Sequence, residues 1–165
     1  MPFTYRVNRL KNINPVVYYV NGTCDFHGSQ EELFMISTKG RYALRVMIDL
    51  AENENGHYIP LKDIAERQDI SKKYLEIIVK DMVAGGLLTG ASGKGGGYKL
   101  CRRPEEYSVG EIIELMEGTM SSVVCLADKS IDCPRRSSCH TLPMWEEYDR
   151  MVHDFFYGKK LSDLL

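Results

Sequence analysis

Two short segments with the period of an α-helix, separated by a three-residue turn, constrain this 165-residue chain more than any other feature. Residues 61–68 and residues 72–84 each repeat apolar side chains at helical spacing. The turn between them is Asp69-Ile70-Ser71, and Ser71 is a favourable N-cap for the second helix. The apolar positions of the second segment follow the spacing i, i+3, i+4 and i+7: Leu75, Ile78, Val79 and Met82. The pattern predicts a helix-turn-helix, whose second helix can enter the major groove of DNA.

The second of these helices is basic on the side opposite its apolar stripe. That side carries Lys72, Lys73, Glu76 and Lys80. Charges on a single helix are most often a solvated surface, so the sequence that follows has to decide between that interpretation and a DNA-binding face.

A glycine-rich segment follows the basic helix. Gly85-Gly86 ends the helix, residues 87–89 can form a strand, and the glycine-rich run 90–97 leads into a second strand at residues 98–102. We expect a β-hairpin, a wing whose glycines let the backbone lie close to a partner surface. The basic residues that would meet phosphates are Lys94 at the tip and, behind it, Lys99, Arg102 and Arg103.

Glycine-rich loops also bind nucleotides, but neither of the common phosphate-binding motifs fits. A P-loop would need a glycine and a Ser or Thr where Leu88 and Gly95 stand. A dinucleotide fingerprint beginning at Gly93 would need a glycine where Tyr98 stands. The order helix–strand–strand also differs from the strand–loop–helix order of nucleotide sites. We therefore expect a protein that is not an enzyme.

The charge distribution favours a nucleic-acid partner. The chain has 21 Lys+Arg and 23 Asp+Glu, a net charge of −2, and such a balance ordinarily argues against DNA binding. Residues 71–103, however, carry +5, and residues 104–165 carry −6. A basic centre is masked by an acidic C-terminal part.

The N-terminal residues 1–34 differ from the rest of the chain. They lack helical periodicity, and their one apolar run, residues 16–20, can form a lone strand. They also lack the order of a signal peptide, and no apolar run approaches a membrane span, so we expect a cytoplasmic protein with no membrane partner. Patterned sequence begins at Met35, with a helix expected over residues 38–54. The simplest hypothesis is that Met35 is the native start and that residues 1–34 are a disordered leader; a genuine N-terminal arm is the alternative.

Three of the five cysteines lie within fifteen residues, in the spacing Cys-x7-Cys-x5-Cys: Cys125, Cys133 and Cys139. An odd total and the absence of a secretion signal argue against a disulfide framework. Thiolates are suitable ligands for iron–sulfur clusters, zinc or Cu(I), although the Cys-x2-Cys pair of many zinc sites is missing. A redox thiol switch and three incidental cysteines are the alternatives. Cys101, alone on the second wing strand, is expected to be a small packing residue.

Two further helices are expected around the cysteines. Ser108 and Glu111 have the spacing of a capping box, which predicts a helix from residue 109 that Gly118 ends. After the cysteines, an amphipathic helix at about residues 142–158 carries an apolar stripe: Trp145, Tyr148, Val152 and Phe155. The stripe is broad for one small domain, so we expect it to form a dimer interface. Packing within its own chain is the alternative.

Taken together, three motifs resemble one bacterial family: Ile36–Leu44, Ile70-Ser71 followed by Tyr74-Leu75-Glu76, and Gly93–Tyr98. It is the winged-helix transcription regulators typified by IscR, NsrR, RirA and CymR, and the resemblance covers residues 35–165. It implies a mainly α homodimer with a small β-hairpin wing. Residues 35–104 would form a winged helix-turn-helix DNA-binding domain. Residues 105–165 would supply a sensor loop, about 119–141, and the long C-terminal dimerisation helix.

The resemblance also implies which residues contact DNA. They lie on the second helix of the helix-turn-helix and on the wing: Ser71, Lys72, Lys73, Tyr74, Glu76, Lys80, Ser92, Lys94 and Tyr98. Where some members have an arginine that reaches into the minor groove, this chain has Ser92.

In the family, the cysteine loop can hold a 2Fe-2S or 4Fe-4S cluster. The spacing of Cys125, Cys133 and Cys139 resembles RirA and favours 4Fe-4S over 2Fe-2S. The two fourth ligands found in the family do not transfer, because Leu142 and Arg41 stand at those positions. His140 is the candidate fourth ligand from this chain.

These features lead to one expectation. The chain would be a cytoplasmic homodimer that binds a pseudo-palindromic double-stranded DNA operator and acts as a repressor. A metal-binding iron–sulfur site would control its operator affinity in response to iron or cluster status, redox state or nitric oxide. One alternative keeps the DNA-binding domain with a zinc or thiol-switch site, and another is a redox electron-transfer protein.

Overall fold

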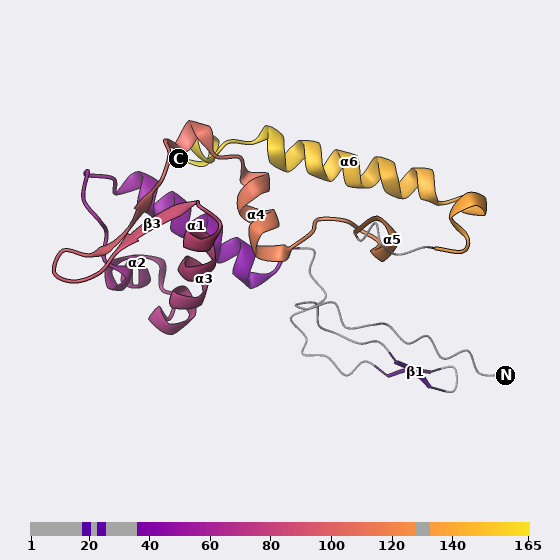
Figure 1. Cartoon of the computed structure of the whole chain (residues 1–165), viewed down its shortest axis with the longest axis horizontal. Coiled ribbons are helices and arrows are strands. Elements are labelled where there is room, and N and C mark those ends of the chain that lie inside the picture. The colour runs from indigo at the N-terminus through magenta and orange to yellow at the C-terminus, as the bar shows by residue number, and fades with distance from the viewer. Residues whose placement is uncertain (1–17, 21–22, 26–35, 128–132) are drawn as a thin grey trace. The chain divides into compact units, whose positions relative to one another are not determined.

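The computed structural model describes residues 18–20, 23–25, 36–127 and 133–165 (Figure 1). The chain divides into two compact units, residues 1–34 and residues 35–165. In the first unit, β1 (Tyr18–Val20) and β2 (Thr23–Asp25) pair as an antiparallel hairpin. The strand expected at residues 16–20 is therefore paired, not alone. The hypothesis that Met35 is the native start concerns residues outside the described ranges.

The second unit is mainly helical, with one antiparallel hairpin, as the sequence predicts. Its elements, in chain order, are α1 (Thr38–Glu52), α2 (Leu61–Gln68), α3 (Lys72–Ala84), β3 (Leu88–Ala91), β4 (Gly97–Leu100), η2 (Pro104–Glu106), α4 (Val109–Glu117), α5 (Val124–Ala127), η3 (Arg136–Ser138), α6 (Leu142–Gly158) and η4 (Leu161–Leu164). Within the described ranges, no helix is both long and apolar enough to span a membrane.

Local sequence explains where these helices begin and end. The Ser71 hydroxyl oxygen accepts a hydrogen bond from the Tyr74 backbone N–H (3.2 Å), which caps α3 as predicted. Ser108 and Glu111 form the predicted capping box of α4. Helix α1 ends two residues earlier than expected. Asn53 is the C-cap there: its backbone leaves the helical conformation (φ −104°, ψ 16°), and its backbone and side-chain N–H groups both donate to the Asp49 carbonyl.

Helices α1 to α4 share one hydrophobic core with the base of the hairpin. Tyr107, which is fully buried, joins its parts: its hydroxyl donates to the Leu87 carbonyl (2.8 Å) and accepts from the Arg102 backbone N–H (2.8 Å). Burial raises the pKa of the Tyr107 hydroxyl. The bond to Leu87 therefore holds the first strand of the hairpin against the start of α4.

A third backbone segment, the one before α2, pairs with the two-stranded hairpin, which the sequence pattern does not show. Ile59 and Tyr98 exchange two backbone hydrogen bonds, of 2.9 and 2.8 Å, so the segment before α2 pairs with β4. Gly97 makes this approach possible, because a Cβ atom there would lie under 3.0 Å from the Ile59 carbonyl. The bridge attaches the wing to the start of the helix-turn-helix.

Helix α6 differs from the other long helices because none of its residues is buried. Its C-terminal end packs on α4, where a Cβ atom on Gly110 would lie under 3.0 Å from the Tyr157 ring. Beyond α6, Val109 donates its backbone N–H to the Lys159 carbonyl (2.8 Å), and Leu161 is fully buried. The last residues of the chain therefore belong to the core.

Candidate nucleic-acid interface and cysteine loop

Helix α3 separates its apolar and charged sides as the sequence predicts. The apolar positions Leu75, Ile78, Val79 and Met82 are buried, and the charged positions Lys72, Lys73, Glu76 and Lys80 are exposed. Both acidic residues of this helix have partners: Glu76 pairs with Lys72 (3.7 Å), and Asp81 pairs with Lys39 of α1 (2.6 Å). Within the described residues, neither Lys73 nor Lys80 forms an ion pair. The outward face therefore has a net positive charge.

Tyr74 is held on the side of α3 that faces α1. Its ring meets the Tyr42 ring edge-on, with centroids 5.8 Å apart, and the Arg45 guanidinium lies 5.3 Å from the Tyr42 centroid. Arg45 also donates to the side-chain oxygen (3.0 Å) and the backbone carbonyl of Gln68, at the end of α2. The side chains of α1 thus connect both helices of the helix-turn-helix.

A buried acidic residue strengthens the same connection. Asp49 of α1 is 1 % exposed, and its carboxylate accepts two hydrogen bonds from Arg67, of 2.9 and 2.6 Å, and one from Gln68 (3.0 Å). The hydrogen bond to Asp49 raises the pKa of Arg67 despite partial desolvation. The sequence pattern did not predict this network. The sequence does contain a sign of it, because Asp49 lies beside Met47 and Leu50 on an apolar helix face. A charge buried on such a face is normally paired, so a basic partner could have been expected.

The wing tip presents one free cation. Ser92 and Lys94 are exposed, and Gly93 and Gly95 on either side of Lys94 have left-handed backbone angles (φ 90° and 80°). Such angles favour glycine, so the glycine-rich run explains the tight tip. Lys94 has no ion pair within the described part of the chain. Tyr98, which lies opposite Gly90 in the hairpin, is half-buried and packs against the core.

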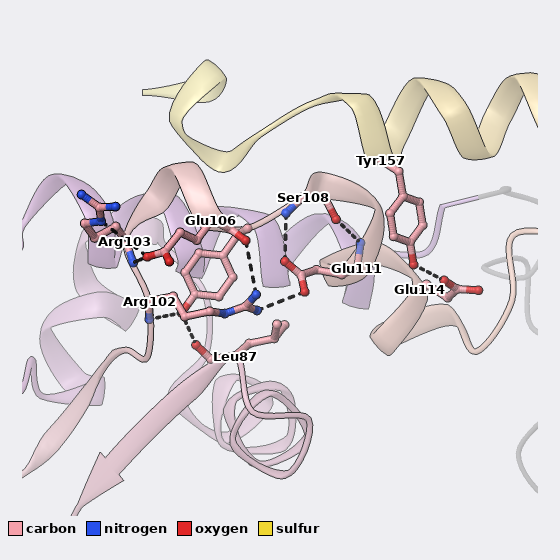
Figure 2. Close-up of polar contacts among 9 residues, drawn as sticks. Leu87, Arg102, Arg103, Glu106, Ser108, Glu111, Glu114 and Tyr157 are labelled. Carbon is pink, nitrogen blue, oxygen red and sulfur yellow. Dashed lines mark hydrogen bonds and ion pairs between the residues drawn. The ribbon is translucent and has the colours of Figure 1, made fainter.

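The three basic residues behind the tip, which we expect to meet phosphates, also contact other residues of this chain. The Lys99 ammonium lies 4.7 Å from the centre of the Tyr58 ring. Figure 2 shows Arg102 paired with Glu111 (3.0 Å) and the Arg103 backbone N–H donating to Glu106 (2.9 Å). The Arg103 side chain also pairs with Glu106 (3.5 Å) but is 82 % exposed. These contacts join the end of the wing to η2 and α4, and the sequence pattern does not show them because the acidic partners lie on other elements.

The three clustered cysteines lie at the ends of a loop whose centre, residues 128–132, is outside the described ranges. Cys125 lies on α5, Cys133 precedes η3 and Cys139 follows it, and all three are half-buried. The described residues contain no group of three His, Cys, Asp or Glu side chains arranged around a metal position. His140, the candidate fourth ligand, is exposed.

Other contacts hold the ends of this loop together. Arg136 donates to the Cys125 backbone carbonyl (3.3 Å) and pairs with Glu146 of α6 (3.7 Å). The Cys139 thiol lies 3.5 Å from the Thr141 hydroxyl, and this hydrogen bond lowers the pKa of Cys139. Three half-buried thiols and a nearby guanidinium fit an iron–sulfur group in their chemistry. Gathering the thiols around it would require the loop to close.

Cys101 does not have the role that its position on the wing strand suggests. It lies one residue beyond β4 and is exposed, so its expected role as a packing residue is wrong. Its backbone N–H donates to the Leu87 carbonyl (3.3 Å). The strand ends at Leu100, and the chain turns there toward η2.

The apolar stripe of α6 is only partly covered within the described residues. A shallow apolar groove is lined by Tyr148, Met151, Val152, Phe155 and Phe156. Phe155 is 60 % exposed, and Trp145 is half-buried. Packing within the chain, the alternative to a dimer interface, therefore leaves part of this stripe in contact with solvent and none of it fully buried.

Comparison with known proteins gives a consistent result. The sequence model of the Rrf2 family, described as an iron-dependent transcriptional regulator, matches residues 36–165. The regulator IscR of Aliivibrio salmonicida is 32 % identical over 130 residues, covering 79 % of this chain and 76 % of the relative. The structure of CymR, the global cysteine regulator of B. subtilis, has a TM-score of 0.64 at 32 % identity, covering 80 % of this chain and 96 % of that one. The structure of T. potens IscR has a TM-score of 0.59, also at 32 % identity, covering 78 % and 84 %.

Proposed function

The chain belongs to the Rrf2 family of helix-turn-helix transcription regulators, and we propose that it is a homodimeric repressor that binds a pseudo-palindromic operator through α3 and the wing tip. One observation carries this proposal: the outward face of α3 exposes Lys73 and Lys80 without ion pairs in the described chain. A face of this kind is built to meet an anionic partner. Its presence on the second helix of a helix-turn-helix makes that partner duplex DNA.

The proposed DNA contacts are of two kinds: contacts to phosphates, which position the protein, and contacts to base edges, which recognise the sequence. Lys73 and Lys80 on α3 and Lys94 on the wing bind phosphates and orient the protein on the duplex. Glu76 lies on the exposed face, where a helix in the major groove meets base edges, and Tyr74 lies beside this face, against Tyr42 of α1. Ser71 caps α3, so its contribution to DNA binding is to hold the first turn of the helix in place.

A salt titration of DNA binding tests this proposal. The probe is a duplex that the full-length protein selects from a randomised library. If a dimer places three lysines per subunit on phosphates, the logarithm of affinity falls with the logarithm of salt concentration with a slope of about −5. Binding that is insensitive to salt, or no selection of a duplex, would contradict the proposal.

The dimer forms through α6. Its groove around Val152 and Phe155 is apolar, and a two-fold axis would place two such grooves against each other. Pairing of these helices sets the distance between the two copies of α3 and hence the half-site spacing of the operator. Phe155→Asp should give a monomer in analytical ultracentrifugation. Val83→Asp, at an exposed position of α3, should leave the assembly unchanged.

Cys125, Cys133 and Cys139 hold an iron–sulfur cluster in this proposal, with 4Fe-4S favoured over 2Fe-2S and His140 as a candidate fourth ligand. When bound, such a cluster supplies a redox- and nitric-oxide-sensitive centre. Residues of the loop connect the cluster site to the dimer helix. With the group bound, the three thiols would hold the loop closed. Arg136 contacts both the Cys125 carbonyl and Glu146 and so links the loop to the dimer helix. A change in the loop alters operator affinity only if the two forms differ in their affinity for DNA.

Purification under anaerobic conditions, with iron, sulfide and zinc analysis, tests the site. Cys125→Ser, Cys133→Ser and Cys139→Ser should each lose the visible absorption and the iron, while Cys101→Ser should keep both. Mössbauer spectroscopy then identifies the cluster type. A colourless protein with stoichiometric zinc would favour the zinc alternative.

A thiol switch is the second candidate for the same loop. The observation in its favour is that the described residues form no metal-ligating group of three, while the Cys139 thiol has a lowered pKa. The structural similarity to a regulator described as the global cysteine regulator of B. subtilis points the same way. A colourless, metal-free protein whose operator affinity changes on thiol oxidation would establish this candidate.

A further inference from the structure

One large apolar side chain lies on the charged face of α3. Ile77 is 52 % exposed, although the other isoleucine of this helix, Ile78, is fully buried. Ile77 follows Lys73 by four residues and precedes Lys80 by three, so the three side chains are neighbours on one face of the helix. The apolar residues that join α3 to the core lie on the opposite face.

The charges around Ile77 decide what can cover it. Lys73 and Lys80 lie on either side along the helix and form no ion pair within the described residues. An apolar protein surface would have to bury two unpaired ammonium groups to reach Ile77, which is costly. Duplex DNA carries phosphates on both edges of the major groove. It can pair with both lysines and present base edges between them.

Among base edges, only thymine offers an apolar group in the major groove, its 5-methyl group. We propose that Ile77 is a specificity-determining residue that contacts the 5-methyl group of a thymine in each operator half-site. Contact between the isoleucine side chain and this methyl group removes apolar surface of both from water. The contact therefore favours thymine over cytosine, which lacks the methyl group, at that position.

This inference rests on the proposed entry of α3 into the major groove, and it makes a further claim about one base. The test is a double-mutant cycle across the interface, made with the full-length protein and the selected duplex. Each thymine is replaced in turn by uracil, which removes only the methyl group. For the wild-type protein, replacing one particular thymine in each half-site should lower the affinity for the duplex about four-fold, which is the effect of one buried methyl group.

The protein side of the cycle uses Ile77→Ala. This variant should bind the thymine duplex several-fold more weakly and should no longer distinguish thymine from uracil at that position. The matched control is Val83→Ala, because Val83 is also exposed on α3 (39 %) but lies six residues further along the helix than Ile77, near its C-terminal end. It should keep the wild-type preference. Circular dichroism verifies that each variant is folded.

Three outcomes would overturn the inference. The uracil effect could be the same in Ile77→Ala as in the wild type, or no thymine could respond to loss of its methyl group. In both cases salt-dependent binding by α3 and the wing would stand and the role of Ile77 would fall. If the wild type selects no duplex at all, the proposed function falls together with it.

Discussion

Glu117, the last residue of α4, caps the first turn of α1 through Ser37. Its Oε1 accepts hydrogen bonds from the Ser37 backbone N–H (3.0 Å) and from the Ser37 hydroxyl (2.8 Å). Ser37 in turn accepts from the Gly40 N–H (3.3 Å) as the N-cap of α1. A carboxylate at a helix N-terminus also interacts favourably with the helix dipole. Gly118 follows Glu117 directly and leads into the cysteine loop. Glu117 therefore links the start of that loop to the start of α1.

Replacing Glu117 tests this link. Glu117→Ala leaves the Ser37 donors without their acceptor and should lower the free energy of unfolding by about 1–2 kcal/mol. Chemical unfolding followed by circular dichroism measures it. Glu105→Ala, which removes an exposed carboxylate with no ion pair in the described chain, should change stability little. Equal stability of the two variants would mean that the cap has no energetic role.

The Asp49 network should matter more than an exposed ion pair. Asp49→Asn removes the buried charge that Arg67 and Gln68 contact, and we expect a loss of about 1–3 kcal/mol in the free energy of unfolding. Because Arg67 is 37 % exposed, its freed side chain can still reach water, which limits the loss. Urea titration measures it.

The comparison for Asp49 is Lys62→Ala, which breaks the exposed Lys62–Glu66 pair (3.5 Å) on α2. Lys62→Ala should lower the free energy of unfolding by less than about 0.5 kcal/mol. The interpretation of the Asp49 network fails if both variants unfold at the same urea concentration.

Lys94 is the one wing cation that we expect to touch a phosphate. Lys94→Ala should reduce the salt slope of operator binding by roughly one unit per subunit. Lys99→Ala removes a lysine that already interacts with Tyr58 and should leave the slope near the wild-type value. Fluorescence anisotropy over a range of salt concentrations measures both slopes. If Lys99→Ala reduced the salt slope more than Lys94→Ala does, Lys99 and not Lys94 would be the wing lysine that contacts a phosphate.

The contact between α4 and α6 has no room for an extra methyl group. Gly110→Ala places a Cβ atom against the rigid Tyr157 ring and should destabilise the fold by about 1–3 kcal/mol. Gly158→Ala, at the end of α6, meets no atom within 4 Å and should be neutral or slightly stabilising. Thermal unfolding separates the two, and equal melting temperatures would contradict the packing.

Stability should also depend on pH through Tyr157. The Tyr157 hydroxyl donates to Glu114 (Figure 2), and this bond, together with burial, raises the pKa of Tyr157 from 10.0 to about 12. The folded state therefore holds the proton more tightly than the unfolded chain. The stabilisation is complete below pH 10.0 and is lost as the pH rises toward about 12.

Tyr157→Phe isolates this effect. The difference in the free energy of unfolding between wild type and variant should shrink across that pH interval. A difference that stays constant with pH would show that Tyr157 has the same pKa in the folded and unfolded states.

Much of the fold could be read from the sequence because it depends on neighbours along the chain. The bounds of α2 and α3, the cap at Ser71 and the capping box at Ser108 involve residues no more than four positions apart. The helical period alone assigned Lys73 and Lys80 to the exposed face, and three short motifs identified the family. Such patterns need no knowledge of the rest of the molecule.

Only the tertiary structure decided which of these residues are free to act. Arg102 is bound by Glu111 and Asp49 binds Arg67, and both pairs join elements that the pattern treats separately. Cys101 proved exposed because the strand ends one residue before it. The sequence alone determined the helices and the side of α3 that faces outward, since both follow from local periodicity. The partners of each charge depend on how distant segments pack, and this left Lys94 as the cation of the wing tip.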